Sequence, residues 1–206
     1  MPKIVDHPSR KREIARAVLR VVAREGVRGV TIRRVADEAG WSTGVLSHFL
    51  GDKRALLLAA VREAAEGIGD RMTASATLAD VDDRLRALLE AGMPLDDERT
   101  AMCRIFFYFW AEGLVDPQLG AELASYYAWW RAQVRAAIEQ AQREGRFATF
   151  DAGELSESLV ALADGLGVQS MFDAVAMAAE RLRGHVATIL THLGAAPPRR
   201  KRRAHG

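Results

Sequence analysis

The chain has 206 residues, of which 49% are hydrophobic and 27% charged, and it has one cysteine, Cys103. This composition is ordinary for a globular protein, and a chain of this length can bury a sizeable core without disulfides or metals. A single cysteine excludes an intrachain disulfide and favours a reducing, cytoplasmic location. No apolar run approaches the roughly 18 residues that span a bilayer, and the first residues do not resemble a signal peptide, so we expect no membrane association.

The net charge of +2 conceals an uneven distribution along the chain. Residues 1–54 hold 12 Lys and Arg against 6 Asp and Glu, whereas residues 55–198 hold 12 against 21. The last residues, 199–206, add five basic side chains and no acid. A basic head on an acidic body predicts that one end of the molecule meets a polyanion. The acidic body argues against an architectural protein that compacts DNA along its whole surface.

The first part of the chain predicts four helices, at about 9–26, 31–40, 42–51 and 53–72. The first has apolar residues every three or four positions, which predicts one buried face. The second and third are short, and the tight turn Ala39-Gly40-Trp41 joins them. Residues 31–50 therefore predict a helix-turn-helix, whose second helix enters the DNA major groove. An ordinary helical hairpin with a solvated polar face is the alternative.

The predicted second helix of this unit has side chains that suit DNA. Ser42, Thr43, Ser47 and His48 are compact hydrogen-bonding groups, and Gly44 between them would let the backbone approach a phosphate closely. Lys53 would place a cation at the start of the next helix, where free N–H groups also favour a phosphate.

The remainder predicts five longer helices, at about 80–93, 97–114, 117–145, 152–172 and 174–193. Nine of the 14 aromatic residues fall within 106–130. Helical spacing places most of these on two faces that would line an apolar ligand pocket: Phe106, Phe109 and Trp110 on one, and Tyr126, Trp129 and Trp130 on the other. Core or dimer packing is the alternative for any single residue. A cage for a quaternary ammonium is one such pocket, with Glu112 or Asp116 adding charge.

The last two predicted helices carry long apolar stripes. Two recognition helices must lie about one DNA turn apart to read a palindrome, so we expect these helices to form a two-fold interface. Completing the core of a single chain is the alternative. The predicted interface residues are Leu155, Leu159, Leu162, Leu166, Met171, Val175, Leu182, Val186 and Ile189. The basic segment 199–203 either adds salt-sensitive DNA affinity or is a solvated terminus.

No motif of a catalytic or metal site is present. The five histidines lack metal-ligand spacing, no G-x-S-x-G elbow or P-loop occurs, and Gly165-Leu166-Gly167 follows no predicted strand. We therefore expect no catalytic residue, no metal and no cofactor. A helical enzyme without a recognisable motif is the competing class.

Residues 31–57, Thr-Ile-Arg-Arg-Val-Ala-Asp-Glu-Ala-Gly-Trp-Ser-Thr-Gly-Val-Leu-Ser-His-Phe-Leu-Gly-Asp-Lys-Arg-Ala-Leu-Leu, strongly resemble the DNA-binding domain of TetR-family transcriptional regulators, most closely the BetI-like branch. The resemblance implies an all-α homodimer with a helix-turn-helix domain over 1–53, a connecting helix at about 53–72, and a ligand-binding and dimerisation domain over 54–196. A disordered basic tail would cover 197–206. The implied function is that of a repressor that binds a palindromic double-stranded DNA operator and is released by a small-molecule effector, for which a choline-like compound is one possibility.

The resemblance also extends the expected DNA contacts. It places Thr43 and Gly44 at the start of the recognition helix, Ser47 and His48 in the groove, and Thr31 and Lys53 on phosphates. Three positions depart from the family: Phe49 replaces a usual Tyr or His, Leu50 replaces the common Phe that anchors the helix to the core, and Trp41 replaces a small aliphatic residue. Trp41 would either pack on the core or reach the DNA backbone. The full expected set is Thr31, Arg33, Trp41, Ser42, Thr43, Gly44, Val45, Ser47, His48, Phe49 and Lys53.

Overall fold

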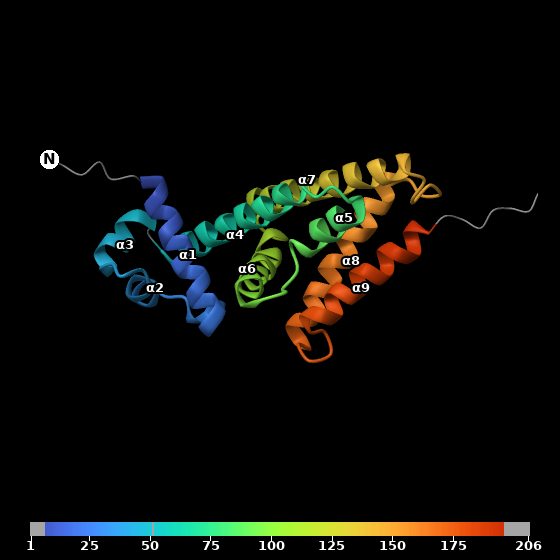
Figure 1. Ribbon diagram of the computed structural model, residues 1–206. Helices are drawn as coiled ribbons and strands as arrows, with labels where there is room; N and C mark the ends of the chain where they lie inside the picture. The colour runs from blue at the N-terminus through green and yellow to red at the C-terminus, as the bar shows by residue number, and fades with distance from the viewer. Residues whose placement is uncertain (1–6, 51, 196–206) are drawn as a thin grey trace, which may run out of the picture.

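The computed structural model describes residues 7–50 and 52–195, and within them it has helices and no strands (Figure 1). The expected all-α class is confirmed. The helices are α1 (His7–Glu25), α2 (Ile32–Ala39), α3 (Thr43–Leu50), α4 (Lys53–Ser75), α5 (Val81–Glu90), α6 (Asp97–Gly113), α7 (Pro117–Arg143), α8 (Ala152–Phe172) and α9 (Ala179–Gly194). A short 3-10 turn, Val27–Gly29, joins α1 to α2. No helix in these ranges is long and apolar enough to cross a membrane. The predicted basic tail lies outside the described residues.

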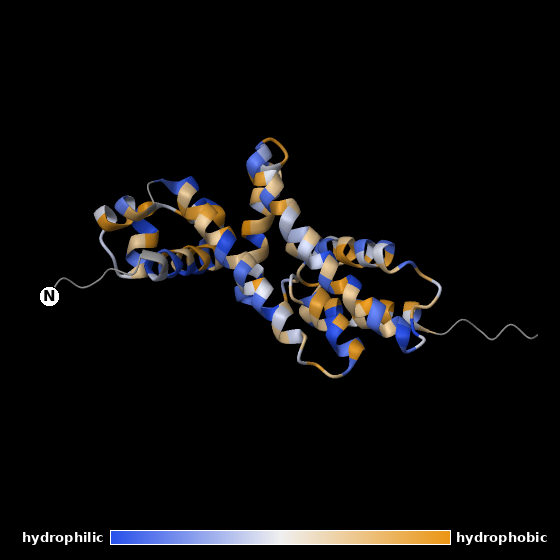
Figure 2. Ribbon diagram, turned by 90° about the horizontal axis from the view of Figure 1, so that it is seen from above, coloured by the Kyte–Doolittle hydropathy of each residue, from blue (hydrophilic) through white to orange (hydrophobic). Residues whose placement is uncertain are grey.

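Helices α1, α2 and α3 form a head at one end of the molecule, and α4 runs from this head towards the body (Figure 1). Hydrophobic and hydrophilic residues are interspersed along the helices (Figure 2). The core of the head does not stop at α4, because Ile14 and Leu57 belong to the same buried cluster as Ile105 and Phe109 of α6 and Leu119 of α7. The domain boundary at 53/54 stays a prediction, and the buried core of the head extends past it into α4, α6 and α7.

A second core holds α5, α7, α8 and α9 together, and it contains over half of the residues expected at a dimer interface. These are at most 9% exposed within the single chain, so they leave no surface for a partner: Leu155, Leu159, Leu166, Leu182 and Val186. Leu162 and Ile189 pack half-buried against the same core. This packing corresponds to the alternative in which the helices complete the core of one chain.

The connection between α8 and α9 also differs from the sequence expectation. We expected the last helix to begin near residue 174, but α9 begins at Ala179. Asp173 forms a local turn instead: its carboxylate accepts the Ala176 N–H at 2.9 Å and its carbonyl accepts the Met177 N–H at 2.9 Å. Short polar side chains compete with helix in this way. Val175, expected on an apolar stripe, is 90% exposed in this turn, and Met171 just before it is half-buried.

Candidate DNA interface and effector cavity

The turn between α2 and α3 is built by local capping. The Thr31 hydroxyl accepts the Arg34 N–H at 3.2 Å and so begins α2. Gly40 ends α2 in the left-handed conformation, with φ at 70°, which a glycine adopts without steric cost. The Trp41 N–H then donates to the Ala36 carbonyl at 2.9 Å. These bonds fix the direction in which α3 leaves α2.

Helix α3 presents a polar face to solvent. The Ser42 hydroxyl accepts the Val45 N–H at 3.3 Å and caps the helix, and Leu46, 1% exposed, anchors it to the head core. The residues expected to read DNA bases or approach its backbone are exposed on the remaining surface: Thr43, Gly44, Val45, Ser47 and His48. Their contacts with DNA stay a prediction, but the structure leaves them accessible.

The other expected DNA contacts surround this face. Lys53 begins α4 directly after α3 and donates to the Arg28 carbonyl at 3.4 Å, and both Lys53 and Arg33 are exposed. Trp41 and Phe49 are half-buried against the head core, with their rings 5.8 Å apart in an edge-on arrangement. Trp41 thus packs on the core, which was one of its two expected placements.

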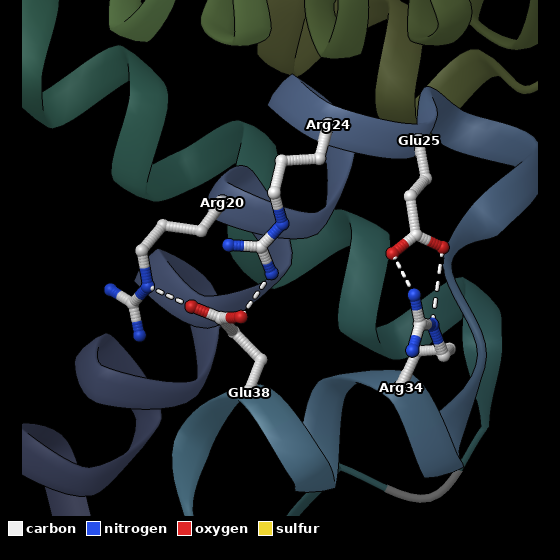
Figure 3. Close-up of polar contacts among 5 residues, drawn as sticks. All are labelled: Arg20, Arg24, Glu25, Arg34 and Glu38. Carbon is white, nitrogen blue, oxygen red and sulfur yellow. Dashed lines mark hydrogen bonds and ion pairs between the residues drawn. The ribbon is translucent and has the colours of Figure 1, made fainter.

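Ion pairs neutralise much of the positive charge of the head (Figure 3). The Glu38 carboxylate of α2 accepts hydrogen bonds from Arg24 and Arg20 of α1, and these bonds hold its pKa below the usual range. Glu25 pairs in the same way with Arg34. Arginines 12, 16 and 54 are also paired with carboxylates. Among the described head residues, the cations without an ion pair are Arg10, Lys11, Arg28, Arg33 and Lys53.

A cavity of about 460 Å³ lies in the body, between α4, α6, α7 and α8. Four of the six residues expected to line a pocket do line it, namely Phe106, Tyr126, Trp129 and Trp130. Phe109 does not, because it is fully buried in the core shared with the head. Further wall residues that the sequence reasoning missed are Phe107, Tyr127, Met72, Cys103 and Asp164.

Aromatic rings form one end of this cavity. Tyr127 and Trp130 lie nearly parallel, with ring centroids 6.4 Å apart. The Trp130 indole N–H donates to the Leu88 carbonyl at 2.9 Å, and a Cβ atom at Gly92 would lie 3.1 Å from the Trp130 ring. The absence of a side chain at Gly92 therefore lets the Trp130 ring pack against the backbone of this wall.

Asp164 supplies a negative charge among these rings. Its carboxylate lies near the Tyr127 hydroxyl and makes no ion pair with any described residue, and burial raises its pKa to about 6. It is therefore mostly ionised at neutral pH. Trp110, expected in the pocket wall, does not line the cavity, and its ring centroid lies 6.1 Å from that of Tyr127. Burial and the nearby Asp164 raise the pKa of Tyr127. Spacing along one helix carries no signal for this residue, because the rings around it come from α6 and α7.

The acids expected to add charge to the pocket lie elsewhere. Asp116 and Glu112 pair with Arg54 of α4, at 2.7 Å and 3.8 Å, and neither lines the cavity. Arg62, which does line it, is held at 2.9 Å by Glu122, and this carboxylate also accepts the Tyr126 hydroxyl.

The remaining wall charges are balanced and unreactive. Glu66 is paired with Arg12. The Cys103 thiol donates to the Gly92 carbonyl, and burial raises its pKa to about 12, so it offers no reactive thiolate. Asp164 therefore provides the uncompensated charge of the cavity, and an aromatic chamber with one such carboxylate suits an organic monocation.

The fold and these two sites define a class of protein, a helix-turn-helix head joined to a helical body that holds an aromatic cavity. Comparison with known proteins agrees. Residues 14–60 match the family described as bacterial regulatory proteins of the tetR family, and residues 81–195 match the BetI-type transcriptional repressor C-terminal family. The chain belongs to the TetR family of transcriptional regulators, with a BetI-type C-terminal region.

Individual relatives are similar over different lengths. The transcriptional regulator BetI of Cronobacter sakazakii is 32% identical over 123 residues, which cover 58% of this chain and 61% of that protein. The chain thus matches less than two thirds of this relative. The regulator PksA of Bacillus subtilis is 30% identical over 89% of both chains. A transcriptional regulator from Saccharomonospora viridis, crystallised in complex with choline, superposes with a TM-score of 0.80 at 28% identity, over 90% of this chain and 97% of that one.

Proposed function

We propose that the chain is a ligand-responsive repressor that binds a palindromic operator through α3 and is released by an organic monocation. The observation that carries the DNA-binding part is the exposed polar face of α3, anchored by Leu46 and followed by Lys53. The observation that carries the effector part is the Asp164 carboxylate inside an aromatic cavity. Binding of the effector shifts the equilibrium between two conformers only by its difference in affinity for them.

The first experiment measures fluorescence anisotropy with duplex DNA from the region upstream of the gene. A scrambled duplex at the same near-physiological salt concentration is the control. We expect a preference of about 10³-fold for the upstream duplex. Equal, weak binding to both duplexes would contradict the proposal that the chain recognises an operator in this upstream region.

Substitutions on the head then separate two kinds of DNA contact. We expect Lys53→Ala to weaken binding to all sequences, since a phosphate contact carries no base information. Ser47→Ala and His48→Ala are expected to change base preference by about 1–3 kcal/mol per contacted base pair. The measurement is anisotropy against duplexes with single base-pair changes. Equal effects of the three substitutions on specific and random DNA would refute these roles.

The effector part is tested with choline as the probe. Choline is the ligand in the related structure from Saccharomonospora viridis, and it is a monocation. Its neutral carbon isostere, 3,3-dimethylbutan-1-ol, has the same shape without the charge and is the matched control. We expect choline, and not the isostere, to release the upstream duplex. Release by both compounds, or by neither, would contradict a cation site at Asp164.

We also propose that two chains associate through the surfaces of α8 and α9 that the core leaves exposed. Phe172 and Val175, 88% and 90% exposed at the end of α8 and in the turn after it, support this, since large apolar side chains at such exposure favour a partner. Light scattering at micromolar concentration tests the association. A stable monomer would contradict it.

A further inference from the structure

Arg10 occupies an unusual position beside the recognition helix. It lies in α1, and its guanidinium carbon is 5.3 Å from the centroid of the Trp41 ring and 5.7 Å from that of Phe49. Trp41 belongs to the turn before α3, and Phe49 lies on α3 itself. Three segments of the head therefore meet at this guanidinium, and two aromatic rings attract its charge.

The other arginines of α1 are used differently. Arg16 pairs with Glu63 at 2.6 Å, Arg20 and Arg24 pair with Glu38, and Arg12 pairs with Glu66. Arg10 makes no ion pair with any carboxylate in residues 7–50 and 52–195, so its charge is not neutralised there. Rings that contact a guanidinium satisfy none of its N–H groups, which remain able to donate. The aromatic contacts orient Arg10 without consuming its hydrogen-bonding capacity.

The position of the Arg10 guanidinium beside α3 indicates that its ligand is a DNA phosphate. The Phe49 ring also contacts the ring of exposed His48, with centroids 5.7 Å apart, so Arg10 lies next to the face of α3 proposed to enter the groove. A groove is bordered by phosphates, and the planar fork of an arginine matches a phosphate better than the point charge of a lysine does. Phe49 itself offers no polar atom to the DNA.

We propose that Trp41 and Phe49 form an aromatic platform that holds Arg10 as a binding residue for a DNA phosphate at the edge of the groove read by α3. This inference rests on the proposed DNA binding. It also assigns a role to Trp41, whose indole packs on the head while positioning the cation that meets the backbone. The platform keeps the long arginine side chain oriented before DNA arrives, so less conformational freedom is lost on binding.

The test uses anisotropy titrations of the full chain with the upstream and the scrambled duplex over a range of salt concentrations. Arg10→Gln keeps side-chain length and removes the charge. We expect it to weaken binding to both duplexes by the same factor, at least about tenfold. The slope of log K against log salt is expected to fall by about 0.9 for each Arg10 on a phosphate, and so by about 1.8 for a dimer. Arg16→Gln is the matched control and should leave the slope unchanged, because Arg16 is already paired.

The platform is tested by Trp41→Leu, which keeps an apolar side chain and removes the ring. We expect affinity for both duplexes to fall about threefold, with Trp41→Phe restoring most of it. The double variant Arg10→Gln/Trp41→Leu should bind no more weakly than Arg10→Gln alone, since the two residues act as a unit. Circular dichroism confirms that each variant is folded.

Two outcomes would overturn the inference and leave the proposed function intact. An unchanged salt slope in Arg10→Gln, with the parent chain binding its upstream duplex, would remove Arg10 from the interface while leaving the proposed function intact. Additive losses in the double variant would show that Trp41 does not act through Arg10. Absence of binding by the parent chain to either duplex is distinguishable from both, and it would overturn the proposed function and this inference together.

Discussion

The head and the cavity differ in the sign of the charge that internal pairing leaves. In the head, Glu38 and Glu25 neutralise Arg20, Arg24 and Arg34, so a strongly basic segment retains only a few unpaired cations. In the cavity, pairing cancels the charges of the wall except that of a single carboxylate, Asp164. The charge available for binding is what remains after internal pairing, and in both regions it differs from the balance counted along the sequence.

The largest expected effect tests whether the Asp164 charge holds a cation in the cavity. Asp164→Asn removes the unpaired carboxylate and keeps its size. We expect the affinity for choline, measured by isothermal titration calorimetry, to fall about 100-fold, because loss of a buried charge partner costs several kcal/mol. Binding of the neutral isostere should be unchanged. An Asp164→Asn protein that binds choline as tightly as the parent would show that another group holds the cation.

The pH dependence of the same measurement is the internal control. Because the pKa of Asp164 is raised to about 6, the carboxylate is ionised at pH 7.5 and protonated at pH 5. Choline affinity of the parent should therefore fall as the pH is lowered through 6, by about tenfold per pH unit. The Asp164→Asn protein should show no such fall.

The second effect is on stability: Asp164→Asn is expected to weaken choline binding but to stabilise the fold. Burial disfavours the ionised form of Asp164, so its charge lowers the free energy of unfolding above pH 6. We expect Asp164→Asn to raise the free energy of unfolding at pH 7.5 by about 2 kcal/mol in urea denaturation without ligand. The gain should shrink as pH falls through 6 and vanish below about 3.8, where the carboxyl is protonated in both states. An equal gain at every pH would mean that charge is not its cause.

The smallest effect tests the head. Glu38→Gln releases Arg20 and Arg24 from their carboxylate, so more cations are left to meet DNA. We expect the affinity for a random duplex to rise only a few-fold, with a steeper salt dependence in anisotropy titrations. Glu139→Gln, which breaks the Arg135–Glu139 pair on α7, is the matched control in the body and should change neither quantity. Unchanged random binding in Glu38→Gln would show that these arginines lie away from the DNA.

The helix-turn-helix was predictable because it is encoded locally. Thr31, Gly40 and Ser42 mark helix ends through bonds to neighbours in sequence, and the structure uses each of them in that way. The spacing of Leu46 likewise predicts its burial. In the helix-turn-helix, the residues that end the helices and the residue that packs on the core can therefore both be read from local sequence.

The cavity was only partly predictable, because helical spacing defines a face but not what that face meets. Phe109 shares a predicted face with Phe106, yet it is buried against the head while Phe106 lines the cavity. Leu182 fits an interface stripe as well as a core stripe, and only the packing of α5 against α9 decides between them. Asp164 lies on α8, whereas the aromatic residues of the same cavity come from α6 and α7, so spacing within one helix does not predict that they meet.

The core shared by the head and α6 limits how DNA-binding heads can be exchanged between related proteins. Ile105 and Phe109 fill the head from the side of the body, and both are completely buried. In a chimera joined at residue 53, this head would pack against the α6 of another protein. The side chains on the two sides of the shared core would then not match in shape. We therefore expect that a transplanted head needs α1 to α4 together with α6 and α7, although these segments are not contiguous in sequence.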